Sequence, residues 1–208
     1  MCDSGSMSEP ELAETRAWVE RAVIGLQLCP FARAPQSTGR VRYAFSAAAD
    51  PEALMADLVD ELERLAGEPP ERIETTLLVH PRVLSDFDDY NDFLELAEAA
   101  LTALDLEGEI QIASFHPDYR FAGSAEDDIA NATNRSPFPT LHLLREESIE
   151  RALASFAEPE SIYETNIQTM ERLGSAGWEA LRRACRDDVR TARAAAPERS
   201  RAKPPGES

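Results

Sequence analysis

Hydrophobic residues near the start of the chain recur at the spacing of a helix. They lie three, four and seven residues apart, which predicts an amphipathic helix over 9–27. Ser8 and Glu11 are spaced as a capping box at its start. We expect the helix to end at Cys29-Pro30, because a proline pushes the residue before it out of the helical conformation. The apolar positions of the repeat are Leu12, Val19, Val23 and Leu26.

Strands and helices alternate in the next part of the chain. Segments rich in β-branched and aromatic residues predict strands over 41–47, 73–80 and 109–115. Helical repeats lie between these strands, over 50–67 and over 85–105. Ser85 is the expected N-cap of the second helix. This alternation is typical of the right-handed crossovers that build a parallel sheet.

The pattern changes after the third strand. A long polar segment over 117–137, with a short helix expected from Ser124, precedes a last strand over 139–144. The remaining helices are expected over 146–156 and over 160–193, with a break near Gly174 or Gly177.

The pattern as a whole predicts a single α/β domain over 8–193. It has a small, mainly parallel sheet of about four strands, flanking helices and a helical C-terminal extension. An antiparallel last strand is the alternative, and it would make a two-layer sandwich. Residues 1–7 are predicted to be a flexible leader, and residues 194–208 are predicted to be a disordered tail because they contain too little apolar surface to fold.

Composition narrows the classes of partner. A net charge of −18 over 208 residues argues against a general affinity for nucleic acid or for anionic membrane surfaces. No apolar stretch is long enough to span a membrane and the N-terminus has no secretory pattern, so we expect a cytoplasmic protein. The three cysteines form no paired motif and are expected to be free thiols. A homo-oligomer through the C-terminal helices is compatible with the sequence.

Two of the three histidines end predicted strands and precede a proline. They are His80 and His116. Ligands of an open parallel sheet bind at the carboxyl ends of its strands, so both imidazoles are candidate acid/base catalysts or ligands of a divalent metal. Asp118 and Cys29 are the candidate catalytic groups beside them. The spacing matches no zinc signature, and the alternative is that both histidines only close the strand ends by hydrogen bonds to loop carbonyls.

The polar segment after His116 is rich in side chains that bind anions. An arginine presents a planar fork to a carboxylate or phosphate, while asparagine and serine supply orienting hydrogen bonds, so a small anionic ligand is predicted here. The alternative is that a long loop uses the same residue types to satisfy its own backbone. The candidate substrate-binding residues are Arg120, Asn131, Asn134, Arg135 and Ser136.

Two further residues have a structural alternative. Cys29 is a candidate nucleophile or ligand, but the predicted helix precedes it and Ala32 stands where a second redox cysteine would be, so a buried structural thiol is the alternative. Strand alternation places His142 on the face opposite Leu141 and Leu143. We expect it to be a core histidine with one hydrogen bond.

Four segments together resemble one known family. They read "VIGLQLCPFA", "LLVHP", "IASFHPDYRF" and "ATNRSPFPTLHLLREESI". The chain resembles the uncharacterised bacterial and plastid family catalogued as domain of unknown function 1415, over roughly residues 9–185. The resemblance implies that these segments are a shared core and that the leader and tail are additions of this chain. It implies no activity, cofactor or catalytic residue.

The leading functional hypothesis is an enzyme that acts on a small anionic metabolite through a His/Arg/Asp site at the strand ends. One alternative is a non-catalytic module that binds a ligand or assembles with another protein through the same loop. Another is a thiol redox protein that uses Cys29. The enzyme hypothesis predicts that the histidines, Cys29 and the arginines share one pocket.

Overall fold

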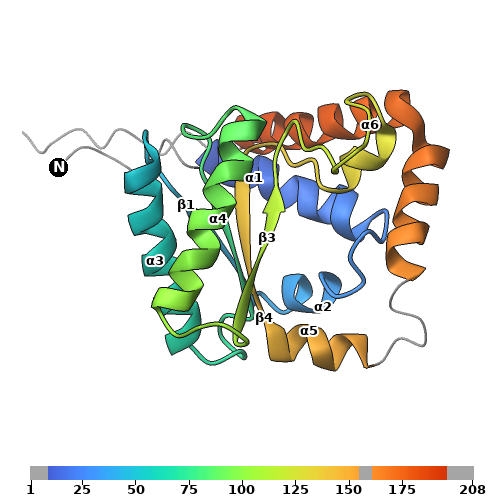
Figure 1. Cartoon of the computed structure of the whole chain (residues 1–208). Helices are drawn as coiled ribbons and strands as arrows, with labels where there is room; N and C mark the ends of the chain where they lie inside the picture. The colour runs from blue at the N-terminus through green and yellow to red at the C-terminus, as the bar shows by residue number, and fades with distance from the viewer. Residues whose placement is uncertain (1–8, 155–160, 196–208) are drawn as a thin grey trace, which may run out of the picture.

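Helices lie on both sides of one small sheet in the computed structural model, which describes residues 9–154 and 161–195 (Figure 1). The predicted cap Ser8, the predicted leader and most of the predicted tail lie outside the described residues. The helices are α1 (Glu9–Trp18), η1 (Val19–Ile24), α2 (Arg33–Ser37), α3 (Pro51–Gly67), α4 (Phe87–Ala103), η2 (Ile129–Thr133), α5 (Glu146–Leu153) and α6 (Ser161–Ala195). The strands are β1 (Val41–Phe45), β2 (Thr75–Val79), β3 (Ile110–Phe115) and β4 (Thr140–Arg145).

The last strand of the chain, β4, lies inside the sheet, and the predicted mainly parallel arrangement is therefore wrong. The strand order is β1-β2-β4-β3. β1 and β2 pair in parallel, but β4 is antiparallel to both of its neighbours, with Val79 and Phe115 opposite Thr140. β1, β2 and β3 still run in one direction, because each antiparallel pairing with β4 reverses the direction. The antiparallel last strand that was the alternative is confirmed.

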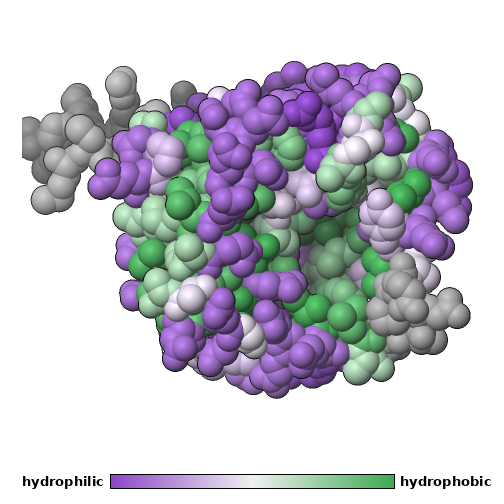
Figure 2. All heavy atoms as spheres, viewed as in Figure 1, coloured by the Kyte–Doolittle hydropathy of each residue, from purple (hydrophilic) through white to green (hydrophobic). Residues whose placement is uncertain are grey.

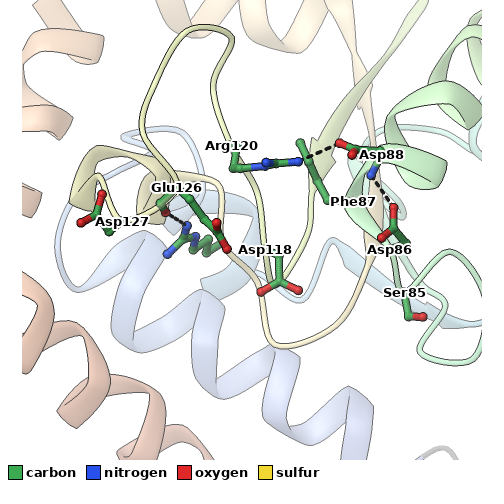
Figure 3. Close-up of a pocket in the computed structure, with 9 residues that line it drawn as sticks. Ser85, Asp86, Phe87, Asp88, Asp118, Arg120, Glu126 and Asp127 are labelled. Carbon is green, nitrogen blue, oxygen red and sulfur yellow. Dashed lines mark hydrogen bonds and ion pairs between the residues drawn. The ribbon is translucent and has the colours of Figure 1, made fainter.

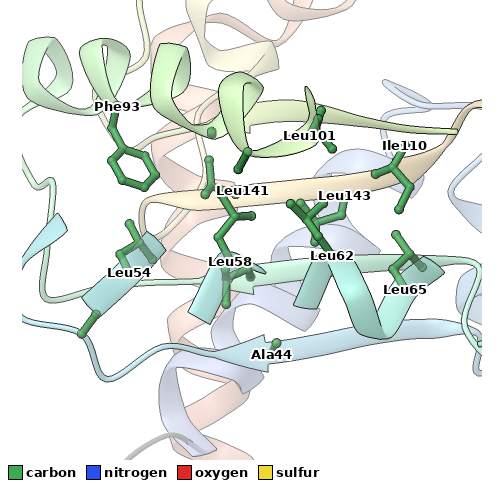
Figure 4. Packing of buried hydrophobic residues seen from close by; sticks show 14 of the residues in the cluster. Ala44, Leu54, Leu58, Leu62, Leu65, Phe93, Leu101, Ile110, Leu141 and Leu143 are labelled. Atoms are coloured by element: carbon green, nitrogen blue, oxygen red, sulfur yellow. The ribbon is translucent and has the colours of Figure 1, made fainter. Parts of the chain in front are cut away.

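α3 and α4 cover one face of the sheet. Leucines at helical spacing along α3 are fully buried against β4, where Leu141 and Leu143 point toward them (Figure 4). Asp50 begins α3 as predicted, since its carboxylate accepts the backbone N–H of Ala53 at 2.8 Å. Truncating one buried leucine to alanine in such a core costs about 2–5 kcal/mol. The buried leucines of α3 are Leu54, Leu58, Leu62 and Leu65.

α1, η1 and α6 cover the other face. Trp18, at the end of α1, packs edge-on against Phe115 of β3 with 5.3 Å between ring centroids. Met170 and Cys185 of α6 are buried in the same cluster as Trp18. Because helices pack on both faces, the protein has three layers rather than the two expected for an antiparallel last strand.

The first helix changes type halfway along. The N–H of Gly25 donates to the carbonyl of Glu20, five residues earlier, at 3.0 Å, which is the bond of a π-helix. A Cβ atom at position 25 would overlap the carbonyl oxygen of Arg21, so this close approach of the backbone requires a glycine. The helix predicted over 9–27 is therefore α1 followed by η1, and it ends at Ile24.

Several local predictions are corrected. Asp86, rather than Ser85, caps α4. Ser124 begins no helix, because the short helix η2 starts later and is capped by Asp128. α2 forms where only a polar connection was expected. The predicted break in the C-terminal helix is confirmed at Gly174, where φ is 66°. None of the described helices is long and apolar enough to cross a membrane.

Candidate functional site

The two strand-end histidines pack against the ring of one tyrosine. His80 and His116 both contact the ring of Tyr90 on α4, with ring centroids 5.8 and 5.1 Å away. The Tyr90 hydroxyl donates to the carbonyl of Thr140 and accepts the N–H of Phe115, so it joins β4 to the end of β3. The sequence pattern placed both histidines at one edge of the sheet, and the structure brings them together there.

His80 is fully buried and neutral. Its Nδ1 donates to the carbonyl of Val83 at 3.2 Å, and its Nε2 has no hydrogen-bond partner among the described residues. Burial lowers the pKa of His80 from 6.5 to about 4, while the hydrogen bond to Val83 acts in the opposite direction. His80 therefore carries no charge near neutral pH. This hydrogen bond to a loop carbonyl fits the alternative in which His80 only closes a strand end.

His116 is held at both ring nitrogens by the backbone. Its Nε2 donates to the carbonyl of Leu84 at 3.2 Å, and its Nδ1 accepts the N–H of Asp118 at 3.0 Å. Burial lowers the pKa of His116 below its usual 6.5. With both nitrogens occupied, this imidazole would have to break a hydrogen bond before it could take part in proton transfer.

Part of the polar loop lines a groove of about 670 Å³ next to these strand ends (Figure 3). Arg120 donates to Asp88 at 2.8 Å across the groove, and Arg135 donates to the carbonyls of Tyr119 and Glu126. Burial lowers the pKa of Arg135. Both guanidinium groups thus have protein partners, and the carboxylates outnumber them. The acidic residues of the groove are Asp86, Asp88, Asp118, Glu126 and Asp127.

The other predicted loop residues bond to their own loop. Asn131 is fully buried, and its amide accepts from the N–H of Phe121 at 3.0 Å and donates to a loop carbonyl at 2.8 Å. Asn134 donates to the carbonyl of Ser114 at 3.2 Å, which ties the loop to β3. The Ser136 hydroxyl donates to the carbonyl of Phe138 at 2.6 Å. These contacts fit the alternative in which such side chains satisfy a long loop.

The structure offers no support for the divalent metal predicted at His80 and His116. Within 9–154 and 161–195, no group of three or more His, Cys, Asp or Glu side chains is arranged to hold a metal ion. The Nδ1 and Nε2 of His116 are both occupied by hydrogen bonds, so it offers no lone pair to a metal without rearrangement.

A second hollow, which we call the sheet cavity, lies on the face of the sheet that points away from α3 and α4. It has a volume of about 550 Å³ and is seen to the right of centre in Figure 2, with a largely hydrophobic wall. The wall is built by the end of α1, η1, all four strands of the sheet, α2 and α5, together with the segment after η1. Its size and its apolar lining are those of small-molecule sites. Apolar residues of the wall are Trp18, Val23, Leu77, Ala113, Phe115 and Ile149.

Charged side chains gather at one end of the sheet cavity, where β1 begins and β4 ends. Arg40 and Glu74 form an ion pair there, and the guanidinium of Arg145 donates to the carbonyl of Ile73. These groups are paired with protein atoms, and the lining of the cavity as a whole is largely apolar.

Cys29 belongs to the sheet cavity and not to the strand-end groove. It lies in the segment between η1 and α2 and lines the cavity wall. Burial raises the pKa of the Cys29 thiol above its usual 9.0, and the nearby N–H groups of Phe31 and Ala32 only partly offset this. The enzyme hypothesis predicted one shared pocket, but the structure separates Cys29 in the sheet cavity from Arg120 and Arg135 in the groove at the strand ends.

His142 of β4, which the sequence predicted to be a core histidine, also lines the sheet cavity. Its Nε2 lies 2.7 Å from the hydroxyl of Thr75, and that hydroxyl lies 2.6 Å from the carbonyl of Leu143. The single hydroxyl hydrogen serves the carbonyl, so Nε2 must be the donor to Thr75. Burial lowers the pKa of His142 from 6.5 to about 4. The predicted single hydrogen bond and the predicted face of the sheet are both observed.

The fold and this geometry define a three-layer α/β protein with a ligand-sized apolar cavity behind its sheet. Among known families, the chain belongs to the one described as "Protein of unknown function (DUF1415)", whose model matches residues 11–180. This confirms the resemblance drawn from the four sequence segments. No curated protein and no solved structure matches the chain.

Proposed function

We propose that this protein binds a small, mainly apolar organic molecule in the sheet cavity. The observation that carries the proposal is the cavity itself, a space of about 550 Å³ with an apolar wall and few polar groups. Sites for drug-sized ligands occupy about 300–1,000 Å³ and combine an apolar lining with a small number of polar atoms.

The wall of the cavity is held in place before any ligand binds. Trp18 packs on Phe115, and the amide of Asn166 on α6 donates to the carbonyl of Leu28 at 2.9 Å, which fixes the segment that leads to Cys29. Gly25 allows the π-helical turn from which Val23 reaches the wall. A wall that is already ordered favours binding, since little conformational entropy is lost when the ligand arrives.

Binding is favoured over covalent catalysis by the state of the two reactive side chains. Within the described part of the chain, no hydrogen bond joins Cys29 to His142, and burial raises the pKa of the thiol. A cysteine nucleophile needs a lowered pKa or an adjacent base. An anion site at Arg120 and Arg135 is a weaker proposal, because both guanidinium groups have partners and carboxylates surround them.

The test is binding of N-phenyl-1-naphthylamine, a neutral fluorophore that brightens in apolar surroundings. We expect saturable binding at one site per chain. Ala113→Phe fills the cavity from β3 and should weaken binding by at least about tenfold, or 1.4 kcal/mol. Ala103→Phe, on an exposed turn of α4, is the matched control and should bind as the unaltered protein does. Absence of saturable binding, or equal binding by both variants, would refute the proposal.

A further inference from the structure

The hydrogen bonds of His142 leave one ring nitrogen as an acceptor. Nε2 carries the hydrogen and gives it to Thr75, so Nδ1 has a lone pair. Among the residues that the structure describes, none forms a hydrogen bond with this nitrogen. Thr75 itself cannot reverse the arrangement, because its hydroxyl hydrogen is held by the carbonyl of Leu143.

The place of His142 in the sheet puts its ring in the largely apolar lining of the sheet cavity. It lies opposite Leu77 of β2 on one side and Ala113 of β3 on the other, and all three residues line the sheet cavity. The charged residues Arg40 and Glu74 lie at the end of the cavity where these strands begin or finish. A ligand in the sheet cavity therefore meets this imidazole in a lining that is largely apolar.

We propose that His142 Nδ1 selects ligands that carry a neutral hydrogen-bond donor, such as a hydroxyl group, on an apolar body. This inference rests on the proposed function, because it assigns a ligand class to the same cavity. An uncharged acceptor in apolar surroundings favours a donor over an isosteric methyl group. A polar group buried without a partner loses its bonds to water, so the same hydroxyl is penalised where no acceptor is present.

The experiment compares 1-naphthol with 1-methylnaphthalene, which differ by a hydroxyl group in place of a methyl group. Each displaces N-phenyl-1-naphthylamine from the unaltered protein, from His142→Phe and from Ala113→Phe. We expect the affinity of 1-naphthol relative to 1-methylnaphthalene to fall about tenfold in His142→Phe, the effect of one lost hydrogen bond. Ala113→Phe should weaken both compounds alike. An unchanged ratio in His142→Phe would overturn the inference and leave the proposed function standing.

A second measurement needs no variant to fold. The chain has three histidines, so the nitrogen-15 resonances of their rings can be separated. The resonance of the unprotonated His142 Nδ1 should move toward that of a hydrogen-bonded nitrogen when 1-naphthol is added, and should stay in place with 1-methylnaphthalene. Movement with neither compound, although both displace the fluorophore, would refute the role of His142. Failure of every compound to bind would refute the proposed function as well.

Discussion

Protonation of His80 should destabilise this protein in acid. The effect can be measured and separated from that of the other titrating groups. The change is His80→Asn, whose side-chain amide can still donate to the carbonyl of Val83 in place of Nδ1. The pKa of His80 is 6.5 when the chain is unfolded and about 4 when it is folded. Between these values the unfolded chain binds more protons, so the free energy of unfolding falls as the pH falls.

The size of the effect follows from the two pKa values. Each unit of pKa difference corresponds to about 1.4 kcal/mol, so protonation linked to His80 lowers the free energy of unfolding by about 3 kcal/mol as the pH falls from 7 to 4. The asparagine variant also loses ring packing against Tyr90, but that loss is the same at every pH. The stability gap between the two proteins should therefore be about 3 kcal/mol larger at pH 7 than at pH 4.

Urea unfolding at a series of pH values, followed by tryptophan fluorescence, measures this gap, because Trp18 and Trp178 are both buried. Taking the difference between the two proteins cancels the carboxylates, which titrate in both. His142→Phe gives an independent comparison, since the pKa of His142 is also lowered to about 4 by burial. A gap between unaltered protein and His80→Asn that does not change with pH would show that His80 is not held neutral by burial.

Two further predictions test the backbone and the thiol of the cavity wall. Gly25→Ala should lower the free energy of unfolding, measured in urea, by about 1–3 kcal/mol, because the new methyl group meets the carbonyl of Arg21. Gly67→Ala is the control, since the space around Gly67 is open, and it should change stability little. Equal effects of the two substitutions would refute the reasoning. Alkylation of Cys29, located by mass spectrometry, should still be accelerating at pH 9 because the pKa of the thiol is raised, and a rate that levels off below pH 8 would contradict this.

The elements governed by local chemistry were predictable from the sequence. α3 is an example, since Asp50-Pro51 begins it and a leucine repeat marks its buried face. The break at Gly174 was equally local. The cap of α4 shows where prediction from local sequence ends. Ser85 was predicted and Asp86 is observed, because both residue types cap helices and only the path of the chain decides between them.

The order of the strands could not be predicted in the same way. The alternation in "TLHLL" specifies two faces for β4, but it is the same whichever direction the strand runs and whichever neighbour it pairs with. The predicted face of the sheet for His142 was therefore correct. Its position in the middle of the sheet depended on contacts between distant segments. The cavity beside it depends further on how α2 and α5 leave that face uncovered, and α2 itself was not predicted.

The position of β4 also helps to explain why the apolar room for a ligand lies behind the sheet, whereas the strand ends border only the polar groove. In an open parallel sheet, a crevice for ligands forms beyond the carboxyl ends of neighbouring strands. Here the chain enters β4 at that edge, and the N–H of His80 donates to the carbonyl of Pro139 at 3.0 Å while that of His116 donates to Asn134 at 3.2 Å. The segment before β4 is thus bonded through its backbone to both strand ends that carry the histidines. The same strand carries His142 to the middle of the opposite face, where it lines the sheet cavity, so the apolar space lies behind the sheet while the predicted edge borders only the polar groove.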